Sequence, residues 1–162
     1  MNVVFWSLFY LVNGVIVIHD CRSHTIKNKH VGALFFVELI RLATKSEVFL
    51  IREFLIYGLA ILVFYIFLNS LSQRMFCSRA VGMGDIKYTI ALSLEVITPH
   101  QSALIVGLRF ILLSWVIGGV FALLSKMKRG LLAEKNARIP FAPAIFIASE
   151  IVRNWPRSNV FV

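Results

Sequence analysis

The chain of 162 residues is 59% hydrophobic and only 15% charged, and its mean hydropathy is +0.81. A soluble domain is about one-quarter charged and could not bury this much apolar surface, so the composition excludes an ordinary water-soluble fold. The net charge of +9 lies mainly in loops, without a basic stripe interleaved with aromatic residues, so no nucleic-acid partner is expected.

Six apolar segments are the predicted elements of the chain. They cover residues 3–19, 31–44, 54–71, 86–98, 102–124 and 139–155. A bilayer core takes about 17–25 helical residues to cross, so the first, third and fifth segments are long enough to span it. The other three carry charged residues or prolines, which we expect near helix ends or against neighbouring helices. The sequence therefore predicts an all-α polytopic membrane protein, a bundle of about six transmembrane helices.

The first segment is predicted to be a retained helix rather than a cleaved signal. No Lys or Arg precedes residues 3–18, and no small-x-small cleavage site follows them. Because the chain shows no internal repeat, linker or low-complexity tract, residues 1–162 are expected to form a single integral membrane domain. Cys21 and Cys77 are isolated in loops, which favours reduced thiols.

The basic residues of the loops predict the orientation of the helices. Ten of them lie after the first segment, before the fourth and after the fifth: Arg22, Lys27, Lys29, Arg74, Arg79, Lys126, Lys128, Arg129, Lys135 and Arg138. The positive-inside rule places these loops in the cytoplasm and both termini outside, in the inner (plasma) membrane. Anionic lipid headgroups are their expected partner, since each Lys or Arg near the surface contributes about 1 kcal/mol of attraction.

Two aspartates are the strongest candidates for chemistry. Asp20 ends the first segment and Asp85 begins the fourth, so both face the cytoplasm if the second and third segments each cross the membrane. Two nearby carboxyls cannot both ionise easily, and a pair that shares a proton can act as base and acid in peptide hydrolysis. From the chemistry alone, polar helix ends at a wet interface explain these positions equally well.

Three motifs favour the catalytic interpretation. Residues 81–87 read Val-Gly-Met-Gly-Asp-Ile-Lys and resemble the G-x-G-D motif of the type IV prepilin and preflagellin peptidases, followed by that family's aliphatic-Lys pair. Residues 26–28 resemble the Ile-Pro-Asn that follows the family's first aspartate, with Lys27 in place of Pro. Residues 139–143 resemble its Ile-Pro-Phe-Gly-Pro, with Ala142 in place of Gly. The motifs occur in the family's order, and together with the six apolar segments and the two aspartates they cover nearly the whole chain.

The resemblance implies an aspartic-type endopeptidase that removes the short basic leader of prepilin-like precursors at the cytoplasmic membrane face, in type IV pilus assembly or protein secretion. Asp20 and Asp85 would be its catalytic residues. The residues expected to bind substrate are Gly82, Gly84, Lys87, Asn28, Pro140 and Pro143. Larger members also carry a cytoplasmic domain with paired cysteines between the first two helices and methylate the new N-terminus. That space holds only Cys21–His30 here, so the resemblance is to a short form and does not extend to methylation.

Several of these residues have an alternative explanation in the sequence itself. Glycines such as Gly82 and Gly84 let a substrate backbone approach a carboxylate, but they also serve close helix packing. Lys87 would either stabilise negative charge on the aspartate pair or anchor its helix at the headgroups. No cofactor is expected. No metal is expected either, because three histidines near Asp20 share no helical face: His19, His24 and His30.

Polar residues inside the apolar segments predict contacts between helices. Asn13 is expected to form an interhelical hydrogen bond, and Glu95 is a candidate to pair with Arg109 across the bundle. Two other functions stay open on the residues alone: a small ion- or proton-coupled transport protein that binds its cation at the aspartates, and a non-catalytic subunit of a pilus or secretion assembly. The oligomeric state is not predicted.

Overall fold

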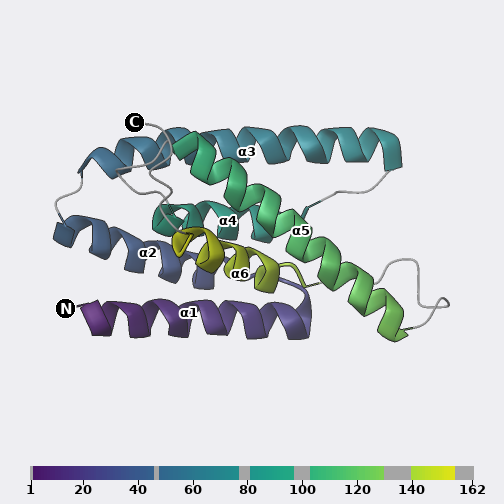
Figure 1. Cartoon of the computed structure of the whole chain (residues 1–162), viewed down its shortest axis with the longest axis horizontal. Helices are drawn as coiled ribbons and strands as arrows, with labels where there is room; N and C mark the ends of the chain where they lie inside the picture. The colour runs from purple at the N-terminus through teal and green to yellow at the C-terminus, as the bar shows by residue number, and fades with distance from the viewer. Residues whose placement is uncertain (1, 46–47, 77–80, 97–102, 130–139, 156–162) are drawn as a thin grey trace.

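The computed structural model describes residues 2–45, 48–76, 81–96, 103–129 and 140–155. In these ranges the regular structure is helical: α1 (Asn2–Ser23), α2 (Asn28–Lys45), α3 (Val48–Phe76), α4 (Met83–Val96), α5 (Ala103–Arg129) and α6 (Ala142–Arg153). Figure 1 shows α4 and α6 between α1 and α3, with α5 running obliquely across the bundle. The predicted all-α polytopic fold is confirmed. Cys77 and the basic positions at 79, 135 and 138 lie outside the described residues.

Three helices are long and apolar enough to cross a membrane. The candidate spans are Val3–Ser23 in α1, Phe54–Met75 in α3 and Ile105–Ser125 in α5. They coincide with the first, third and fifth apolar segments, so that prediction is confirmed. Only 22%, 28% and 28% of these spans is buried inside the bundle, which leaves most of their apolar side chains facing outward. A lipid surrounding would solvate those side chains.

The short helix α4 lies at the centre of the bundle, where it contacts α2, α3, α5 and α6. Thr89 and Ser93 can be buried there because each hydroxyl donates to a carbonyl of the preceding turn, at 2.8 and 2.7 Å. The fully buried Tyr88 donates to Asn13 Oδ1 of α1 at 2.7 Å. The predicted interhelical hydrogen bond of Asn13 is therefore confirmed.

Charged side chains form a cluster where α4 and α6 end. Arg41 Nε of α2 lies 2.9 Å from Glu38 Oε2 and 3.4 Å from Glu95 Oε2 of α4. Arg153 of α6 lies 3.7 Å from Glu95 Oε1 and also pairs with Glu150. Because removing one partner of a buried ion pair leaves an uncompensated charge, typically at a cost of about 3–5 kcal/mol, the cluster fixes α2, α4 and α6 to one another.

The prediction that Glu95 pairs with Arg109 is wrong. Glu95 points to Arg41 and Arg153, while Arg109 is exposed on α5. The sequence shows that a buried glutamate needs a cation, but the choice of cation depends on which helices pack beside it.

Candidate active site

Asp20 is a buried carboxylate in the last turn of α1, with 3% of its surface exposed. Its Oδ2 accepts a hydrogen bond of 2.9 Å from the backbone N–H of Ala142, the first residue of α6. The N-terminus of a helix leaves its first N–H groups without partners inside the helix, and these groups favour a nearby negative charge. The start of α6 therefore lies against the carboxylate at the end of α1, although the two residues are 122 positions apart in the sequence.

Asp85 lies in the first turn of α4, outside the three candidate spans. Burial, followed by the negative charge of Asp20, raises the pKa of Asp85 to about 7, while a hydrogen bond from the Gly82 backbone acts in the opposite direction. The charge of Asp20 acts on Asp85, so the two carboxyls lie within electrostatic range of each other. Two carboxyls that interact can share one proton, and sharing a proton is what acid and base action by such a pair requires.

A side chain of α3 fixes the segment that leads to Asp85. Asn69 Oδ1 accepts a hydrogen bond from the Val81 N–H at 2.9 Å, and its Nδ2 donates to the Val81 carbonyl at 3.0 Å. This two-bond contact pairs both backbone groups directly before Gly82. Sequence reasoning missed Asn69, although an amide near the end of a long apolar segment is a signal of such a contact.

The segment after α1 lies against the start of α4. Lys87 Nζ donates to Asn28 Oδ1 at 3.0 Å, so two of the expected substrate-binding residues contact each other at an exposed position. A Cβ built on Gly84 would lie 3.0 Å from Ile26 Cβ, and one built on Gly82 would lie 2.9 Å from Asp85 Oδ2. Gly84 therefore lies beside the chain's own backbone, whereas the exposed Gly82 lies beside the carboxylate.

Pro140 and Pro143 flank the residue that contacts Asp20. Phe141 is the N-cap of α6, and Pro143 stands in its first turn, where a missing backbone N–H leaves no helical hydrogen bond unmade. The motif at residues 139–143 thus starts α6 at the point where Ala142 can donate to Asp20. The predicted site residues lie at the end of α1, which carries Asp20, and at the starts of α2, α4 and α6 or in the segments leading into α4 and α6.

The histidines near Asp20 make local contacts. His19 Nδ1 lies 2.7 Å from Ser23 Oγ and 2.9 Å from the Thr25 carbonyl oxygen, and its ring meets that of His30 at a centroid distance of 5.4 Å. Over the described ranges, no three His, Cys, Asp or Glu side chains are grouped as metal ligands would be.

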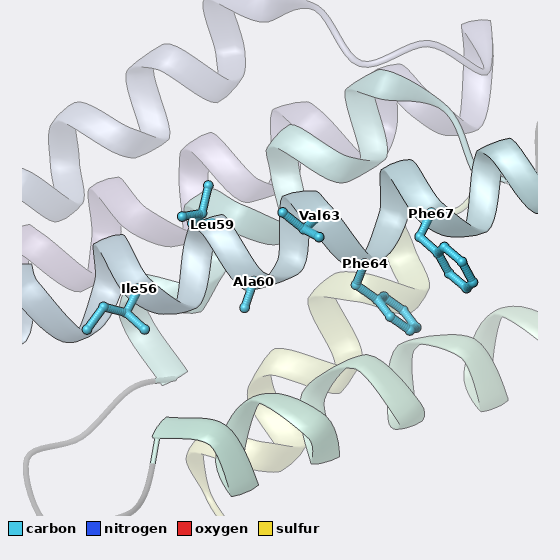
Figure 2. A pocket seen from close by; sticks show the side chains of 6 residues that line it. All are labelled: Ile56, Leu59, Ala60, Val63, Phe64 and Phe67. Atoms are coloured by element: carbon cyan, nitrogen blue, oxygen red, sulfur yellow. The ribbon is translucent and has the colours of Figure 1, made fainter.

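A shallow apolar hollow runs along one side of α3 (Figure 2). Six residues line it: Ile56, Leu59, Ala60, Val63, Phe64 and Phe67. None of them offers a group for acid, base or nucleophilic chemistry, so the hollow is part of the outward apolar surface of α3 rather than a catalytic pocket.

Comparison with known proteins gives one match. The sequence model of a family described as the type IV leader peptidase family matches residues 7–123. This stretch includes Asp20 and Asp85 and runs from α1 into α5, while α6 lies beyond it. No curated protein and no solved structure matches the chain.

Proposed function

Because the chain belongs to the type IV leader peptidase family, we propose that it is an aspartic endopeptidase that cuts the short basic leader from prepilin-like precursors. Asp20 and Asp85 are its catalytic pair in this proposal. What supports it is that Asp20 at the end of α1 and Asp85 in the first turn of α4 lie within electrostatic range, where the charge of Asp20 adds to the effect of burial on the pKa of Asp85. They are the chain's two aspartates, and both lie within the matched residues.

The pair can hydrolyse a peptide with a proton-balanced cycle. One carboxylate takes a proton from water as the oxygen attacks the scissile carbonyl carbon, and the other carboxyl donates its proton to the carbonyl oxygen. The first carboxyl then protonates the leaving amine as the C–N bond breaks, and the second recovers a proton from the tetrahedral intermediate. Both groups end in their starting states.

Recognition of the precursor is expected to depend on apolar contact. The loops of this chain and the expected leader are both basic, so long-range charge attraction does not bring them together. The outward faces of α1, α3 and α5 give the apolar helix of a precursor a surface to lie beside within the bilayer. The leader junction would then reach the exposed Gly82 beside Asp85, where a small residue before the scissile bond fits best.

Co-expression with prepilin-like precursors tests the function. We expect a precursor with its basic leader and apolar helix to be shortened by wild-type protein, and mass spectrometry of the product to place the cut at the end of the leader. A matched precursor whose junction residue is changed from small to bulky should remain uncut. An ion transporter or an assembly subunit would leave every precursor intact, and that outcome would reject the peptidase proposal.

The orientation of the site in the membrane is a separate prediction. Cys21 is exposed beside Asp20, and Thr44 is exposed near the other end of α2. In a Cys77→Ser background, a membrane-impermeant thiol reagent should label Cys21 in inverted vesicles and not in intact cells. Thr44→Cys, made together with Cys21→Ser, should be labelled in intact cells and not in inverted vesicles. If both positions label from the same side, the helices do not cross as proposed; if Cys21 labels from outside, the site does not face the cytoplasm.

A further inference from the structure

The two aspartates have unequal surroundings. Asp20 is 3% exposed and receives the Ala142 N–H at the start of α6, a helix of 12 residues. Asp85 is partly buried, and its pKa is raised to about 7 by burial and by the charge of Asp20. A helix N-terminus stabilises negative charge within its first turn, and this one reaches Asp20. The surroundings therefore favour charge on Asp20 and the proton on Asp85.

We infer that α6 is a positioning element that assigns the two catalytic roles: the Ala142 N–H holds Asp20 as the base, and Asp85 is the acid. Asp20 then takes the proton from the attacking water, and Asp85 donates its proton to the scissile carbonyl oxygen. The inference rests on the proposed peptidase function. Ala142 acts through Asp20 and is a positioning residue rather than a catalytic one.

The packing of α6 keeps this N–H in place. At its start, the Phe141 ring lies against Gly118 of α5, where an added Cβ would come within 2.1 Å of the ring. The same ring meets Trp115 edge-on at a centroid distance of 6.4 Å. At its end, the Arg153 guanidinium lies 4.5 Å from the centre of the Trp6 ring of α1. Both ends of α6 are therefore fixed, and its first N–H cannot move away from Asp20 without disturbing α5.

Other titratable groups lie near the aspartate pair, and their effects on the pH profile differ from those of the two aspartates. Cys21 of α1 and Tyr88 of α4 lie within electrostatic reach of Asp20, and Tyr65 of α3 within reach of Asp85. Thiols and phenols ordinarily titrate above pH 8, so they do not produce a loss of activity in acid. The Nδ1 of His19 hydrogen bonds with Ser23 and the Thr25 carbonyl rather than with the pair.

Replacing the Ala142 amide by an ester tests the inference directly. Cell-free translation of the full chain with lactic acid at position 142 removes the N–H and keeps the shape of the residue. The matched control has the same replacement at Ala144, whose N–H donates to the Phe141 carbonyl within α6. Cleavage per membrane-inserted molecule is then measured against pH.

The expected result is a shift of one limb of the pH profile. Without the donor, the negative charge on Asp20 loses one hydrogen bond that stabilises it, so the acid limb should move upward by about one pH unit. The alkaline limb reports loss of the proton from Asp85 and should stay in place. The Ala144 ester should match wild type. An Ala142 ester with an unshifted acid limb, or equal shifts in both esters, would overturn the inference.

A second pair of variants tests the inference if the ester-containing protein does not insert into the membrane. Gly118→Ala must displace the Phe141 ring, whereas Gly119→Ala places its Cβ in open space. We expect the acid-limb shift in Gly118→Ala and not in Gly119→Ala, and identical profiles would contradict the role of α6. Failure of the peptidase proposal itself is distinguishable, because wild-type protein would then cleave nothing at any pH.

Discussion

Changing either aspartate to asparagine should abolish leader cleavage. Asn keeps the shape of the side chain but can neither take a proton from water nor give one to the scissile carbonyl, so Asp20→Asn and Asp85→Asn should each lower turnover by about 10³-fold or more. Because the two groups act as a unit, the double variant should be no slower than either single variant. The measurement is cleavage of a co-expressed precursor per molecule of membrane-inserted protein.

The charged cluster supplies a matched control for this experiment. Glu95→Gln also neutralises a buried carboxyl of α4, ten residues beyond Asp85 and beside Arg41 and Arg153. It is expected to reduce the amount or thermal stability of the inserted protein while leaving turnover per molecule near the wild-type value. Substantial turnover by Asp85→Asn, with normal accumulation in the membrane, would rule out the catalytic pair.

Hydropathy predicted the number and kind of helices because lipid imposes its own requirement on the chain. Any segment that crosses a bilayer must be apolar and must pair its backbone internally, so α1, α3 and α5 are visible in the sequence alone. Their ends were predicted less well. α3 was expected at residues 54–71 but covers Val48–Phe76, since helical hydrogen bonding continues into polar residues beyond the apolar stretch.

The pairing of Asp20 with Asp85 is a prediction from crossings and motifs, but the contacts made by the residues around the two aspartates could not be predicted. The donor to Asp20 is the backbone N–H at position 142. Every residue except proline has such a group, so residue identities do not indicate which one will bond to Asp20. The Asn69 contact with Val81 joins α3 to the segment directly before α4, between residues 12 apart. Both depend on how the helices pack, which periodicity and composition do not specify.

A substitution at Gly84 is expected to block cleavage, but the sequence and the structure suggest different reasons for this result. The motif suggested that Gly84 admits a substrate backbone, whereas the structure places Ile26 against it, with 3.0 Å to Ile26 Cβ and 3.2 Å to Ile26 O from a built Cβ. The contact joins the segment after Asp20 to the turn that carries Asp85. A larger residue at position 84 must therefore displace Ile26 or the turn that carries Asp85.

Gly84→Val should block cleavage while the protein still inserts into the membrane. A displacement of about 1 Å between catalytic groups can cost about 100-fold in rate, so we expect a loss of at least that size. Gly32→Val is the matched control, because a Cβ at Gly32 meets nothing within 4 Å. Cleavage per inserted molecule is the quantity to compare, and a fully active Gly84→Val protein would remove the proposed role of this glycine.

A rescue experiment separates the two explanations for Gly84. In a Gly84→Ala protein the new Cβ contacts Ile26 Cβ most closely, so Ile26→Gly should relieve the contact and restore part of the lost activity. If Gly84 instead admits the substrate backbone, the added methyl group still obstructs the precursor and Ile26→Gly restores nothing. Because Ile26→Gly alone loosens the segment after α1, the interaction is taken from the full double-mutant cycle. A positive coupling between the two positions would assign Gly84 to holding Asp85 beside Asp20, and zero coupling would assign it to the substrate.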